Sequence, residues 1–82
     1  MDAYTAFFTN NIVLLKLGNK KIRVLSLCDA KCVFLDYIRY NNLKPENLKS
    51  TDGNLISGRE LIATFSYNGR LWSSDEEEII IS

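Results

Sequence analysis

Two cysteines are the side chains of this sequence with the most obvious reactive chemistry. Cys28 and Cys32 stand four residues apart, and without any histidine in the chain they are too few to hold zinc. A disulfide between them would close a small, strained loop, so we expect two reduced thiols. Without histidine, neither a Ser–His nor a Cys–His pair can activate a nucleophile. This inventory predicts a protein that is not an enzyme and that has no cofactor or metal.

A run of acids from Asp75 to Glu78 is the one stretch of like charge. Adjacent carboxylates could attract a cation, but they lack the spaced ligands and the glycine of a calcium loop. A solvated loop that protects the neighbouring strand is the simpler interpretation, and a partner with a basic surface is the alternative.

A basic cluster is formed by Lys16, Lys20, Lys21 and Arg23. The net charge of the chain is zero, and no aromatic residues alternate with these bases, which is not typical of a nucleic-acid site. We expect the cluster to keep an edge strand solvated. Contact with an acidic protein surface and nucleic-acid binding stay open as alternatives.

Length and composition are those of one small folded domain. The chain has 82 residues, of which 46% are hydrophobic, with one proline and four glycines. Apolar runs such as residues 12–15 are far shorter than the roughly 20 residues of a membrane span. Asp2 stands where a secretion signal would be basic. We therefore expect a cytoplasmic protein that binds other proteins and has no membrane, nucleic-acid or small-molecule partner.

The elements that must position these residues begin with a hairpin. Residues 11–17 and 21–27 are rich in apolar residues and flank Gly18, a pattern typical of two antiparallel strands. Every second residue from Val13 is expected to face the core, which leaves Leu14 on the opposite face.

A helix is predicted next, because the apolar period changes from two to 3.6 after Asp29. Asp29 is the expected N-cap, with Cys28 just outside the helix. The helix should end near residues 40–42, since Pro45 cannot continue it. Its apolar face must lie across the hairpin.

The second half of the chain carries strong turn signals. A short strand is expected at residues 47–51, before a turn at Asp52-Gly53. Asn68-Gly69 predicts a hairpin with a type I′ turn. Residues 78–81 are expected to form a buried final strand.

This order of elements is typical of an α+β fold of the β-grasp type. One helix would pack across a mixed sheet of four or five strands, and the last strand would insert beside the first. The segments Val13-Leu14-Leu15-Lys16 and 48–61, the latter ending in Gly-Arg-x-Leu, resemble strands one, three and four of ubiquitin. Leu43-Lys44-Pro45 resembles the Ile-Pro-Pro after its helix. Asp52-Gly-Asn-Leu-Ile56 also looks like a little-described family of small ubiquitin-like proteins in organisms with cilia.

The resemblance covers residues 11–62 and the last strand. It implies a ubiquitin-like domain at residues 11–82 after an N-terminal arm at residues 1–10. Two departures bear on function: the chain ends in Ile-Ile-Ser in place of Gly-Gly, and Lys49 replaces the isoleucine of the ubiquitin recognition patch. We expect a noncovalent interaction module, a small structural or adaptor subunit of an intracellular assembly such as a ciliary axoneme. The alternative is a ubiquitin-like modifier with an atypical or missing Gly-Gly tail.

The aromatic residues that a small core does not need are the candidates for partner binding. Phe7 and Phe8 are expected to anchor the arm on the outer sheet face or on a partner. Trp72 is expected either outside the core or capping the open end of the sheet. The candidate partner-binding residues are Tyr4, Phe7, Phe8, Leu14, Tyr67 and Trp72. The predicted core is Val13, Leu15, Leu17, Ile22, Val24, Val33, Phe34, Ile38, Leu43, Leu48, Leu55, Leu61 and alternate residues of 79–81.

Overall fold

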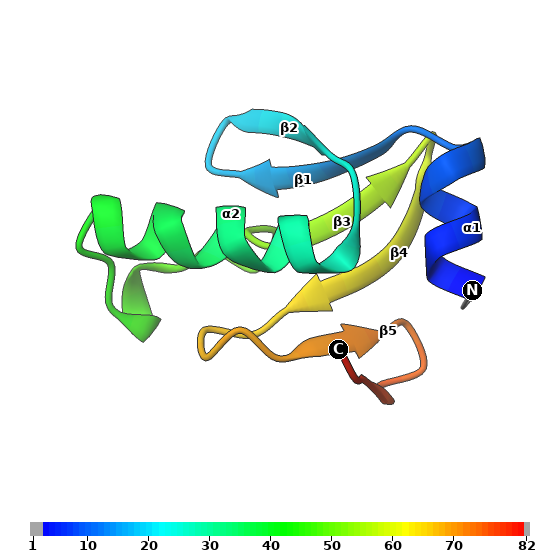
Figure 1. The fold of residues 1–82 in the computed structure, drawn as a ribbon. Helices are drawn as coiled ribbons and strands as arrows, with labels where there is room; N and C mark the ends of the chain where they lie inside the picture. The colour runs from blue at the N-terminus through cyan, green and yellow to red at the C-terminus, as the bar shows by residue number, and fades with distance from the viewer. Residues whose placement is uncertain (1–2, 82) are drawn as a thin grey trace.

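The computed structural model describes residues 3–81, which form one sheet and two α-helices (Figure 1). The predicted α+β class is confirmed. The helices are α1 (Ala3–Asn10) and α2 (Leu27–Tyr40), and a 3₁₀ turn, η1 (Pro45–Asn47), follows α2. The strands are β1 (Val13–Leu17), β2 (Lys20–Val24), β3 (Asn54–Ser57), β4 (Glu60–Phe65), β5 (Leu71–Ser73) and β6 (Glu78–Ile79).

The sheet differs from the predicted one. Within residues 3–81 it has six strands in the order β2-β1-β3-β4-β5-β6, and every neighbouring pair is antiparallel. The predictions of a mixed sheet, of four or five strands and of a last strand beside the first are therefore wrong. β3, and not the last strand, is the second neighbour of β1. Just before β3, the Gly53 N–H donates to Lys16 O of β1 at 2.8 Å. Short hairpins then keep each later strand beside the one before it, so β6 ends at the far edge.

The predicted first hairpin is confirmed. Leu17 pairs with Lys20 across the two-residue loop Gly18-Asn19. Gly18 has φ +61°, and a positive φ at this first loop residue is typical of a type II′ turn, whose twist suits two strands.

The helix α2 begins earlier than predicted. Ser26, and not Asp29, is its N-cap: the Ser26 hydroxyl accepts from the Asp29 N–H at 3.0 Å. The Asp29 carboxylate accepts in return from the Leu25 N–H at 2.9 Å, so the two side chains satisfy two backbone donors. Cys28 consequently lies inside the helix. The end at Tyr40 agrees with the prediction.

The N-terminal helix α1 is a feature that the sequence analysis does not predict, although Tyr4, Phe7 and Phe8 have helical spacing. One carbonyl of its last turn is satisfied by the residue after it: Asn11 Nδ2 donates to Phe7 O at 3.0 Å. Neither helix of residues 3–81 has the length and apolar character that a membrane crossing needs.

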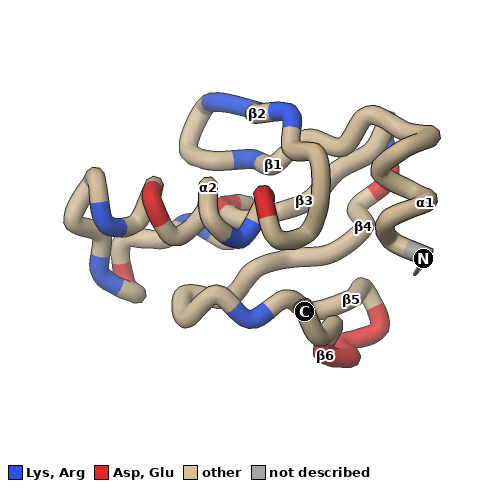
Figure 2. Tube along the Cα trace, viewed as in Figure 1, with Lys and Arg blue, Asp and Glu red and all other residues tan. Residues whose placement is uncertain are grey.

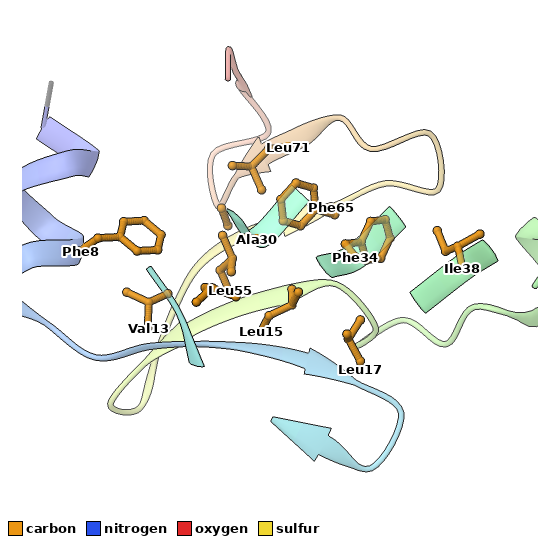
Figure 3. Packing of buried hydrophobic residues seen from close by; sticks show 12 residues of the cluster. Phe8, Val13, Leu15, Leu17, Ala30, Phe34, Ile38, Leu55, Phe65 and Leu71 are labelled. Carbon is orange, nitrogen blue, oxygen red and sulfur yellow. The ribbon is translucent and has the colours of Figure 1, made fainter. Parts of the chain in front are cut away.

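The core lies between α2 and one face of the sheet (Figure 3). Phe34 of α2 is fully buried, and its ring stacks on Phe65 of β4 with centroids 5.1 Å apart. The buried apolar residues are Phe8, Val13, Leu15, Leu17, Val24, Ala30, Phe34, Ile38, Leu55, Ala63, Phe65 and Leu71.

Two predicted core residues are exposed. Ile22 is 37% exposed because β2 is the edge strand. Leu61 is 45% exposed because a register shift in the β3–β4 pair sets it opposite Ile56, whereas the buried Ala63 pairs with the buried Leu55. Val33, Leu43 and Leu48 are half-buried at the rim of the core.

Three further predictions for the second half of the chain are wrong. Residues 47–51 form no strand, because backbone turns and the buried carboxylate of Asp52 organise this segment. The turn at Asn68-Gly69 is not type I′, because only Gly69 has a positive φ, +86°. The last strand ends at Ile79, and Ile80 beyond it is 77% exposed.

Candidate protein-interaction site

The sheet has a second face that neither helix of residues 3–81 covers. α2 lies against the opposite face, and α1 stands at the end of the strands (Figure 1). Leu14 pairs with Ile56 on this open face, and Thr64 pairs with Trp72. All four side chains are half-buried, so apolar and polar groups of one face remain accessible to a partner.

Trp72 lines a hollow of about 520 Å³ at the β5 side of this face. The indole is half-buried, and its Nε1 donates to Ser66 Oγ at 3.4 Å. Trp72 is absent from the buried cluster between the sheet and α2, and therefore lies outside the core. The residues that line the hollow are Thr64, Phe65, Ser66, Trp72 and Glu76.

Glu76 reaches the same hollow from a strained backbone position. Its φ is +64°, which is uncommon for a residue with a side chain. The loop from Ser73 to Glu77 repeats the hydrogen bonds of the loop from Ser66 to Arg70. In the Ser73–Glu77 loop, the Ser73 N–H donates to Glu77 O (2.8 Å) and the Glu76 N–H donates to Ser73 O (3.0 Å).

In the Ser66–Arg70 loop, the Ser66 N–H donates to Arg70 O (2.8 Å) and the Gly69 N–H donates to Ser66 O (2.9 Å). Glu76 thus occupies the position that Gly69 fills there with φ +86°. A strained residue beside a hollow is more frequent at functional sites than elsewhere.

Negative charge lies at one side of this hollow, where Glu76 lines it. Residues 75–78 are all exposed acids, which lie in the turn after β5 and at the start of β6 (Figure 2). Of these four acids, Glu78 is the one with an ion pair to another residue of 3–81: its Oε2 lies 3.9 Å from Arg70 Nε. The carboxylates of Asp75, Glu76 and Glu77 are left to solvent or to a partner.

Leu14 and Trp72 both lie on the open face, but β3 and β4 separate their strands, so the structure does not bring these two candidates together. Tyr4 and Phe8 line a different pocket, beside Ile80 and Ile81. Phe8 is buried beside Val13 in the core, and Tyr4 and Phe7 pack against its rim (Figure 3). The arm therefore anchors on its own domain at the end of the core, and not on the outer sheet face.

Tyr67 lies outside the core but is engaged within the domain. Its hydroxyl donates to Leu43 O at 2.9 Å, which ties the β4–β5 loop to the segment after α2. This contact gives Tyr67 a structural role.

Sequence reasoning missed Glu76. The available signal was the repeat of a Ser-x-x-Gly loop, residues 66–69, as Ser-x-x-Glu in residues 73–76. In the earlier loop of the chain, Gly69 indicates the left-handed position, and Glu76 at the same place in the later loop breaks the pattern.

The two cysteines of α2 are free and exposed. Within residues 3–81 no cluster of side chains is placed to hold a metal ion. Comparison with protein-family models, with curated proteins and with solved structures finds no match to this chain.

Proposed function

We propose that this protein is a noncovalent protein-interaction module that binds a basic segment of a partner at the Trp72 hollow. The observation that carries the proposal is the pairing of an accessible indole with the strained Glu76 in one hollow. An indole face attracts a lysine or arginine side chain, and a nearby carboxylate adds a charge-assisted hydrogen bond.

The neighbouring charges support a basic ligand. Asp75 and Glu77 flank Glu76 and have no ion pair among residues 3–81, so a cationic side chain entering the hollow displaces no internal partner. Leu14 and Ile56 extend the open face beyond the hollow and would contact apolar residues of the same partner. Apolar contacts around a charged anchor exclude water from it and strengthen it.

A structural or adaptor subunit of an intracellular assembly fits such a module. The resemblance to ubiquitin-like proteins of ciliated organisms adds an axonemal or microtubule-associated assembly as the specific proposal. The site does not depend on a ubiquitin-like sheet, because Trp72 and Glu76 lie in the part of the chain that the resemblance does not cover.

The fluorescence of Trp72 tests this function, because the chain has a single tryptophan. A peptide of alternating arginine and leucine should change the emission saturably, and a glutamate–leucine peptide should not. E76Q should weaken the arginine peptide about 5–30-fold, which corresponds to losing roughly 1–2 kcal/mol of charge-assisted contact. E46Q, at an exposed glutamate of η1, is the matched control and should bind like the wild type. Equal affinity of E76Q and wild type would overturn the proposed site.

A further inference from the structure

The two outer strands of the sheet carry opposite charge. β2 presents Lys20, Lys21 and Arg23, all exposed, whereas β6 begins at Glu78 after three other acids. Figure 2 shows the basic strand and the acidic turn at opposite sides of the molecule. No strand of residues 3–81 pairs with the outer side of either, so each edge offers free backbone N–H and C=O groups.

The two edges also run in opposite directions. Each of the five steps from β2 through β1, β3, β4 and β5 to β6 reverses the strand direction, so β2 and β6 are antiparallel to each other. If two copies stand side by side in the same orientation, β6 of one meets β2 of the next as an antiparallel pair. The sheet would continue across the junction with the same pairing it has inside each copy, and α2 of both copies would lie on one side.

The side chains of the two edges match in this arrangement. Ile22 pairs with buried Leu15 and Ile79 with buried Leu71, so both isoleucines lie on the α2 face. With Ile22 opposite Ile79, an antiparallel register sets Arg23 opposite Glu78 on the open face. If β6 extended by one residue on pairing, the exposed Ile80 would lie opposite Lys21, whose stem could cover it.

We propose that this chain self-associates head to tail by pairing β6 of one copy with β2 of a second copy. Like charges disfavour the alternative pairings, β2 with β2 and β6 with β6, so the basic and acidic residues select the mixed junction. Because the contact joins two different edges, it does not close a two-fold dimer and can extend to further copies. This surface is separate from the Trp72 hollow, which uses the face of the sheet and not its edge.

Sedimentation equilibrium of the full chain tests the proposal. The average mass of the wild type should rise above 9.4 kDa with concentration. It should fall back in about 1 M salt, where the screening length is about 3 Å. A basic-edge variant, Lys21→Glu with Arg23→Glu, and an acidic-edge variant, Glu77→Lys with Glu78→Lys, should each stay monomeric. An equimolar mixture of the two variants should associate again, because their edges are complementary.

Controls separate this result from misfolding and from the proposed function. Glu46→Lys with Lys49→Glu changes exposed charges away from both edges and should associate like the wild type. The basic-edge variant should still bind the arginine–leucine peptide, since Trp72 and Glu76 are untouched. A wild type that stays at 9.4 kDa at all concentrations, or a variant mixture that does not associate, would overturn self-association and leave the peptide site unaffected.

Discussion

The carboxylate of Asp52 holds the turn of the first hairpin through Gly18, whose N–H donates to Oδ1 at 2.9 Å. Its other oxygen, Oδ2, accepts from the Lys49 N–H at 3.1 Å. Asp52 is only 6% exposed, so it joins two segments far apart in the sequence at a site that little water reaches. This contact holds the segment before β3 against the β1–β2 turn.

Removing that carboxylate should destabilise the fold. Asp52→Ala leaves the N–H groups of Gly18 and Lys49 without acceptors, and we expect a loss of about 2–3 kcal/mol in the free energy of unfolding. Urea titration measures it. Asp36→Ala is the control, because Asp36 is exposed and its ion pair with Arg39 should contribute less than about 1 kcal/mol. Equal losses in the two variants would contradict the role of Asp52.

The stacked pair of Phe34 and Phe65 should be a main source of stability. Phe34→Ala opens a cavity under α2, and we expect a loss of about 3–5 kcal/mol, a large part of the stability of a small domain. Tyr40→Ala, on the same helix at a side chain that is 92% exposed, should change stability by less than about 0.5 kcal/mol. A loss below about 1 kcal/mol for Phe34→Ala would mean that α2 packs differently.

Glu76 should trade stability for binding. Glycine at φ +64° relieves backbone strain, so Glu76→Gly should raise the free energy of unfolding by about 0.5–1 kcal/mol. The same variant should bind the arginine–leucine peptide more weakly. Glu77→Gly is the matched control: its φ is not positive, and glycine there should lower stability. Lower stability of Glu76→Gly in thermal unfolding would argue against strain at this position.

The helix α1 should belong to the cooperative unit. Phe8→Ala removes a buried ring beside Val13, and we expect a loss of about 3 kcal/mol. Thr5→Ala, at an exposed position of the same helix, should cost less than about 1 kcal/mol. If Phe8→Ala unfolds at the wild-type temperature, α1 does not contribute to the core.

Local patterns in the sequence predicted the local structure well. Gly18 between alternating runs predicted the first hairpin, and the 3.6-residue period predicted α2, since both depend on neighbouring residues. The pairing of β3 with β1 depends on contacts between distant segments, and no local pattern encodes it. The exposure of Leu61 depends on one extra residue in β4, which reverses the expected alternation.

The candidate site was predicted only in part. Trp72 was a candidate because a small core has little room for an indole, and the structure places it outside the core. Phe8 was a candidate on the same argument, but it fills the end of the core next to Val13. Composition cannot distinguish these two outcomes, because both residues are aromatic and the difference comes from where the fold places them, Phe8 at the end of the core and Trp72 on the open face.

The most direct test of the Trp72 site is the ¹H–¹⁵N spectrum of the full chain during titration with the arginine–leucine peptide. The single indole N–H of Trp72, which donates to Ser66 Oγ, gives one resolved signal that reports the hollow itself. We predict that this signal and the backbone signals of Thr64 and Glu76 shift together and saturate at one peptide per chain. Shifts confined to other residues, with an unchanged indole signal at saturation, would contradict the proposed site.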